Sequence, residues 1–102
     1  MTRAGIFEFA APLWRYLGAD GWHFVSLPAE VSTEITDITA GAQRGFGSVR
    51  VAVTVGATSW RTSIFPDNKT GAYLLPVNKA VRAAEHLQAG DEVRAKLQVA
   101  DL

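Results

Sequence analysis

The stretch Gly71–Val99, GAYLLPVNKAVRAAEHLQAGDEVRAKLQV, constrains the fold more than any other part of the chain. Large apolar residues alternate with other residues at its start, which predicts a strand over 73–77. Apolar residues then recur at helical spacing and predict a helix of about three turns. Gly90 and Asp91 predict a turn, with Gly90 at a positive φ, and strict alternation over 93–99 predicts a second strand. The stretch is therefore a strand–helix–turn–strand unit.

Four more strands are expected before this unit. Residues 7–14 alternate with a period of two, and Pro12, which donates no ladder hydrogen bond, is expected at an edge or a bulge. Residues 22–27 are rich in aromatic and β-branched side chains, which favour a strand. Residues 48–65 alternate on both sides of Gly56-Ala57 and predict a hairpin.

A first helix is expected to begin at Pro28, because Val31, Ile35 and Ile38 form one apolar stripe. The chain then holds about six strands and two short helices. Short, evenly spaced strands predict a closed barrel, which removes exposed sheet edges. We therefore expect an all-β fold with two short helices, a six-stranded small β-barrel in one domain over residues 1–102.

The composition excludes several kinds of protein. The chain has 102 residues, ten basic and ten acidic, and a formal charge of zero, which argues against a general nucleic-acid binder. It has no cysteine, so disulfides and thiolate chemistry are absent. No run approaches the roughly 20 apolar residues of a membrane helix. Glu8 and Pro12 interrupt the apolar residues near the start, so these do not form the continuous apolar core of a signal peptide. We expect a soluble, cytoplasmic protein with no membrane partner.

Four segments, FEFAAPLW, WHFVSLPAEV, GFGSVRVAVTVGATSWRTSIFPD and GAYLLPVNKAVRAAEHLQAGDEV, follow each other in an order that resembles the bacterial and archaeal domain-of-unknown-function family numbered 1905. The resemblance covers about residues 5–100. That family is similar in fold to the double-split β-barrel of the AbrB and MazE class of regulators and antitoxins. The resemblance thus implies a double-split-like barrel. It implies no catalytic residue, because the family is named for lacking an assigned function.

Two segments, WHFVSLPAEVSTEI and AYLLPVNKAVRAAE, share one pattern of an aromatic–aliphatic strand, a proline and a helix. Barrels of the AbrB class are usually built by two chains, each of which gives one such unit. Here one chain holds both units, which predicts a barrel that one chain closes by itself. We expect a monomer or a weak homodimer.

Basic residues are the main candidates for a binding site. Arg61 lies opposite Trp60 in its strand, hence on the face away from the core. Lys69 lies in the loop before the last unit, and Lys79 and Arg82 lie one turn apart at its helix start. Cations beside the N–H groups of a helix start suit a phosphate or carboxylate. The alternative interpretation is a solvated charged face.

Two aromatic residues are expected to be partly exposed and to contact a ligand. Trp14 falls on the polar phase of its strand beside Arg15, and Phe46 lies between glycines. Trp60 and Phe24 are expected in the core instead, because small barrels bury large aromatic side chains.

No catalytic residue, metal site or cofactor is predicted. His23 and His86 have no neighbour at ligand spacing. Asp91 is expected to hydrogen-bond the backbone of its own turn. No Ser-His-Asp or paired-carboxylate arrangement can be defended.

The sequence thus favours a non-catalytic binding module for a small anionic ligand or a protein partner. The alternative is a DNA-binding regulator, by analogy with AbrB-like barrels, and the zero charge counts against it. An enzyme ranks third because no nucleophile–base pair is visible. The candidate ligand-binding residues are Arg61, Lys69, Lys79, Arg82, Trp14 and Phe46.

Overall fold

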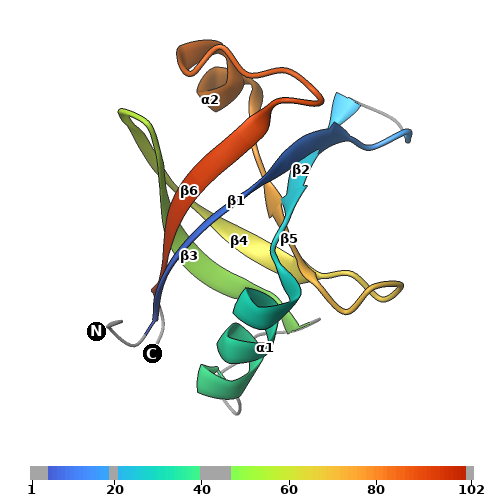
Figure 1. Cartoon of the computed structure of the whole chain (residues 1–102), viewed down its shortest axis with the longest axis vertical. Helices are drawn as coiled ribbons and strands as arrows, with labels where there is room; N and C mark the ends of the chain where they lie inside the picture. The colour runs from blue at the N-terminus through green and yellow to red at the C-terminus, as the bar shows by residue number, and fades with distance from the viewer. Residues whose placement is uncertain (1–4, 19–20, 40–46, 101–102) are drawn as a thin grey trace.

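Six strands and two helices form a closed barrel in the computed structural model, which describes residues 5–18, 21–39 and 47–100 (Figure 1). The strands pair in the order β1-β2-β5-β4-β3-β6, β6 pairs again with β1, and every pair is antiparallel. The predicted barrel with two short helices is confirmed. The elements are β1 (Ile6–Arg15), β2 (His23–Ser26), α1 (Ala29–Ile38), β3 (Val49–Val55), β4 (Thr58–Pro66), β5 (Tyr73–Pro76), α2 (Lys79–Ala84) and β6 (Glu92–Val99).

The long strands β1 and β4 each change partner along their length. β1 pairs with β6 along Ile6–Pro12 and then with β2 along Leu13–Arg15. β4 pairs with β3 along Thr58–Ile64 and with β5 only at Phe65–Pro66. Pro12 is thus the last residue paired with β6, at the point where β1 changes partner, and a residue without an N–H suits that place.

The interior of the barrel is filled by alternate residues of the strands. In β3 and β6 every second side chain is buried, as the sequence predicts. α1 buries Ile35 and α2 buries Val81. Phe24, predicted in the core, is instead half-buried on the outer face, because its neighbour Val25 points inward and is fully buried.

The chain builds two equivalent halves, β2–α1–β3–β4 and β5–α2–β6–β1. β2 and β5 pair with each other, and equivalent backbone bonds flank this pairing: Leu27 N donates to Tyr73 O at 2.9 Å and Val77 N donates to His23 O at 3.0 Å. β3 likewise pairs with β6. The two helices lie at opposite ends of the barrel (Figure 1). This approximate twofold arrangement confirms the predicted repeat within one chain.

α2 is shorter than the three turns predicted. It ends because His86 adopts a φ of 53° and Leu87 N bonds back to Arg82 O at 2.8 Å, the hydrogen bond of a Schellman motif. Glycine usually takes this left-handed position, and no glycine signals it here. Gly90 has the predicted positive φ, and the Asp91 carboxylate accepts a backbone hydrogen bond within its turn, as expected.

The neighbouring leucines Leu75 and Leu74 test the register of β5. Leu75 is fully buried beside Val25, whereas Leu74 is partly exposed on the outer face. We predict that Leu75→Ala lowers the free energy of unfolding by about 2–5 kcal/mol, because it removes core packing and leaves a cavity. Leu74→Ala should cost less than half as much. Urea unfolding measures both, and equal losses would contradict this register.

Candidate functional site

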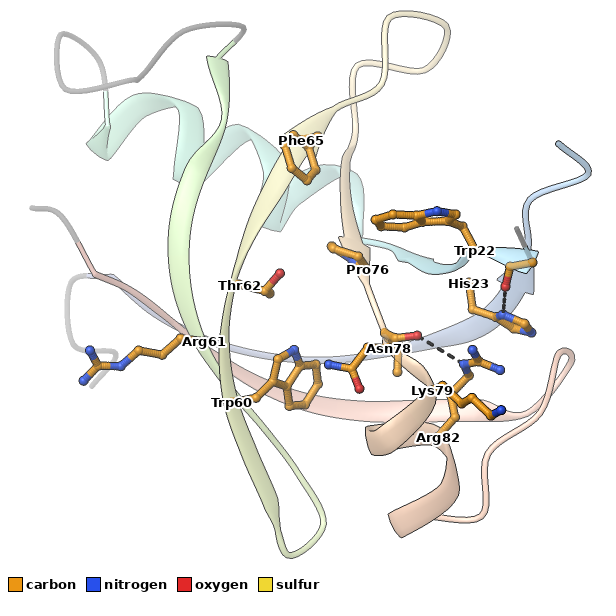
Figure 2. A pocket seen from close by; sticks show the side chains of 12 residues that line it. Trp22, His23, Trp60, Arg61, Thr62, Phe65, Pro76, Asn78, Lys79 and Arg82 are labelled. Carbon is orange, nitrogen blue, oxygen red and sulfur yellow. Dashed lines mark hydrogen bonds between the residues drawn. The ribbon is translucent and has the colours of Figure 1, made fainter. Parts of the chain in front are cut away.

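A pocket of about 430 Å³ opens where β4 separates from β5 (Figure 2). β4 pairs with β5 only at its last two residues. The side chains of Trp60 and Thr62, which lie opposite buried residues of β3, therefore face a gap instead of a neighbouring strand. Trp22 and Pro76 stand across the gap, and the start of α2 closes one end. The lining residues are Gly21, Trp22, His23, Trp60, Arg61, Thr62, Phe65, Pro76, Val77, Asn78, Lys79 and Arg82.

Two cations, Lys79 and Arg82, lie at the α2 end of this pocket (Figure 2). The Arg82 Nε donates to the Val77 carbonyl at 3.2 Å, which holds the guanidinium against the end of β5. Within the described part of the chain neither cation forms an ion pair. None of the described residues that line the pocket is acidic. An anion in the pocket would meet two positive charges that no carboxylate of the described residues neutralises.

α2 starts at Lys79 as the sequence predicts, but it has a side-chain cap that the sequence analysis did not consider. Asn78 is the N-cap, and its side-chain oxygen accepts a hydrogen bond from Val81 N at 2.9 Å. α2 has only six residues, so its dipole is small. The positive charge of the pocket therefore comes from the side chains of Lys79 and Arg82, and the predicted contribution of the helix N–H groups is not supported.

The rest of the wall is largely aromatic. Trp22 and Phe65 are 52% and 43% exposed, although both side chains are large and apolar. Trp22 stacks on Phe24 with ring centroids 5.9 Å apart and planes 18° from parallel. The His23 Nδ1 lies 2.6 Å from the Gly21 carbonyl, and since a carbonyl only accepts, Nδ1 is the nitrogen that carries a proton. The side chains of Trp22 and His23 are thus held in place without a ligand.

Of the predicted basic residues, Arg61 borders the pocket, but its guanidinium points away from it (Figure 2). The alternation of β4 explains this, since Arg61 faces the outside, as predicted. Trp60, predicted in the core, is only partly buried: it packs against the core and also lines the pocket. Arg61 also borders a second hollow together with Arg50 and Gln98. The structure therefore does not bring the Arg61 charge to Lys79 and Arg82.

Lys69 and Trp14 lie at a third hollow, on the outer face of β1, β2 and β5. Trp14 is partly exposed, as predicted, and its indole N–H donates to Ser26 Oγ at 2.9 Å. Trp22 and Phe65 line this hollow as well as the pocket. Phe46 lies outside the described residues.

Sequence reasoning considered Trp22 among the aromatic side chains that could line a pocket but did not select it, and it missed Phe65 as a site residue. A signal existed for Phe65, which falls on the outward phase of its strand and yet is large and apolar. Trp22 directly follows the turn before β2, where a core position is not required. Trp22, Phe65 and Lys79 are far apart in the sequence and come together only when the barrel closes. No local sequence pattern could therefore predict that they line one pocket.

No other kind of site is evident in the part of the chain that the structure describes. No group of three or more histidine or carboxylate side chains there is placed to hold a metal ion. None of the helices described is long and apolar enough to cross a membrane.

The fold and the pocket define a small closed β-barrel with an aromatic and cationic opening beside one helix. The sequence model of the family described as "Domain of unknown function (DUF1905)" matches residues 9–97. The chain belongs to this family, which confirms the resemblance seen in its sequence. A search of curated proteins found no match. The comparisons therefore assign no activity to the pocket.

The N-cap of α2 can be tested separately from ligand binding. We predict that Asn78→Ala lowers the free energy of unfolding by about 1 kcal/mol, because it removes the bond to Val81 N. Asn78→Asp keeps an acceptor at that place and should remain within about 0.5 kcal/mol of the parent. Urea unfolding of the two variants makes the comparison, and an unchanged stability of Asn78→Ala would contradict the cap.

Proposed function

We propose that this domain is a non-catalytic binding module that holds a small anionic ligand in the pocket beside α2. The observation that carries the proposal is the pair of cations, Lys79 and Arg82, which form no ion pair with the residues that the structure describes. They lie in a pocket with no acidic side chain among its described lining residues. The volume of about 430 Å³ falls within the range of small-molecule sites, roughly 300–1,000 Å³. Arginine and lysine are the side chains that bind carboxylates and phosphates most often.

The twofold arrangement supplies an internal control for this proposal. Asn78 and Pro28 both cap a helix, and Ser32 N and Arg82 N both bond to the carbonyl of their cap residue. The two ends of the barrel can therefore be compared position by position. The pocket end carries Trp60, Thr62, Asn78, Lys79 and Arg82 where the α1 end carries Phe9, Ala11, Pro28, Ala29 and Ser32.

Comparing the two ends of the barrel shows whether the fold itself needs a charged residue at the position of Arg82. Ser32 is buried, accepts a hydrogen bond from Tyr73 N at 3.1 Å and lies 3.5 Å from the Leu27 carbonyl. The Arg82 guanidinium meets the equivalent carbonyl, that of Val77. The α1 end thus forms the same junction with a small neutral side chain. The charges of Lys79 and Arg82 are not required by the architecture, which supports a role in binding.

Like charges one helical turn apart also favour an anion. Lys79 and Arg82 are separated by three positions on α2, and such residues are neighbours on a helix surface. Two cations in this arrangement repel each other by a few tenths of a kcal/mol. A bound carboxylate or phosphate replaces this repulsion with two attractions.

The double substitution Lys79→Ala and Arg82→Ser tests the proposal, because it gives the pocket end the residues of the α1 end. We expect the variant to fold, since serine can reach the same carbonyl. The matched control is Lys96→Ala with Arg94→Ser, which removes the same residue types from exposed positions of β6 outside the pocket.

Thermal unfolding is followed in sodium salts of phosphate, acetate, benzoate and cyclohexanecarboxylate, each compared with sodium chloride at equal ionic strength. An anion at ten times its Kd stabilises the folded state by about 1.4 kcal/mol. That raises the Tm of a domain this size by roughly 5–10 °C. We predict this rise for at least one anion in the parent and the control but not in the pocket variant. If no anion raises the Tm above chloride, or if the pocket variant responds like the control, the proposal is wrong.

A protein partner and duplex DNA are the other candidates that the sequence raises. The pocket contributes two positive charges, Lys79 and Arg82, to a chain of zero formal charge. Two charges are too few for strong binding to the phosphate backbone of DNA. The likeness to AbrB-like barrels, on which DNA binding rests, stays a prediction. A pocket of this volume favours a small ligand over both.

A further inference from the structure

We infer that the ligand of this pocket is an aryl anion, in which a flat ring lies against Trp22 and its carboxylate or phosphate meets Lys79 and Arg82. This inference rests on the proposed function and adds the chemical class of the ligand. It depends on a separate observation, the aromatic wall, so it can fail while the proposed function stands.

The aromatic wall consists of Trp22 and Phe65. Leaving these large apolar side chains in water is unfavourable, and the fold does not need them there. Trp22 lies outside β2 and is 52% exposed, and Phe65 is 43% exposed. Neither belongs to the buried core. Aromatic faces bind other flat rings in offset-stacked or edge-to-face arrangements. Two such side chains on one small pocket favour a ligand that has a ring.

Trp22 is held so that one side of its indole is available to the pocket. Phe24 stacks on the indole with planes 18° from parallel, which fixes the tilt of the ring. Phe24 lines the hollow on the outer face but not the pocket. The pocket therefore meets the indole away from Phe24, and the ring is oriented before a ligand arrives. A preorganised wall lowers the entropic cost of binding.

The two exposed aromatic side chains, Trp22 and Phe65, and the two cations lie at different ends of the pocket. Figure 2 shows Trp22 and Phe65 at one end, Lys79 and Arg82 at the other, and Pro76 between them. A ligand that satisfies both ends has an apolar ring joined to an anionic group. A bare anion such as phosphate would leave the aromatic wall in water, and a neutral ring would leave the cations unpaired.

Polar groups along the sides suit the edge of such a ring. The Thr62 hydroxyl and the Asn78 amide also line the pocket. These groups can accept or donate hydrogen bonds to ring substituents. They would discriminate among aryl anions, while the ring and the charge define the class.

Benzoate and cyclohexanecarboxylate make the direct comparison, because they share charge and similar size but differ in the flatness and π-system of the ring. Isothermal titration calorimetry of the intact chain gives the Kd of each. We expect benzoate to bind about threefold to tenfold more tightly, as aromatic pairs contribute beyond their buried area. Phenyl phosphate is titrated beside benzoate to determine which anionic group the two cations prefer.

Trp22→Leu should reduce the preference for benzoate over cyclohexanecarboxylate to below about twofold, since leucine is apolar but has no π-face. Tyr16→Leu is the matched control: Tyr16 is as exposed as Trp22 and contacts Phe24, but it does not line the pocket. This control should keep the full preference. Trp22→Phe keeps a smaller ring and should keep part of it, which provides a second reading if Trp22→Leu does not fold.

The outcomes distinguish this inference from the proposed function. If benzoate and cyclohexanecarboxylate bind the parent equally well, the aryl class is wrong while the anion site stands. The inference also fails if Trp22→Leu keeps the preference. If neither compound binds and phosphate does not either, the proposed function itself is wrong.

Discussion

The antiparallel pairing of β2 with β5 is the contact on which the two halves of this barrel meet. Val25 and Leu75 lie opposite each other at its centre and are fully buried. Each strand then leads within three residues into a helix, so the pairing sends α1 and α2 to opposite ends of the barrel. It also leaves β4 only a short stretch of β5 to pair with. The opening between β4 and α2 is therefore a consequence of how the halves join.

Equivalent halves allow one end of the barrel to change while the other keeps its structure. At the α1 end a buried serine joins the helix to both central strands through Tyr73 N and the Leu27 carbonyl. At the α2 end the longer Arg82 reaches the equivalent carbonyl and brings a charge to the surface. A short helix with a hydrogen-bonded cap, Asn78, completes that end. The same architecture thus accommodates a neutral junction and a cationic pocket.

Much of the fold follows from the sequence, because alternation and turn residues act locally. The hairpin around Gly56, the Gly90-Asp91 turn and the paired strand–helix units were all predictable in this way. Phe24 was not, since the inward phase of β2 is decided by its pairing with β5. Nor was the end of α2, where His86 takes a left-handed conformation without a glycine to signal it.

The candidate site was predictable only in part, for a related reason. Lys79 and Arg82 are close in sequence, so their proximity could be inferred, whereas the pocket's aromatic wall joins residues from β4 and the start of β2.

Backbone amide NMR of the labelled chain, titrated with sodium benzoate, tests most directly the claim that the α2 end of the barrel binds the ligand while the α1 end only supports the fold. The account predicts shifts at Trp22, Thr62 and Val77–Arg82, with Ala11 and Ser32 unchanged. Equal shifts at both ends, or none at the α2 end, would contradict it.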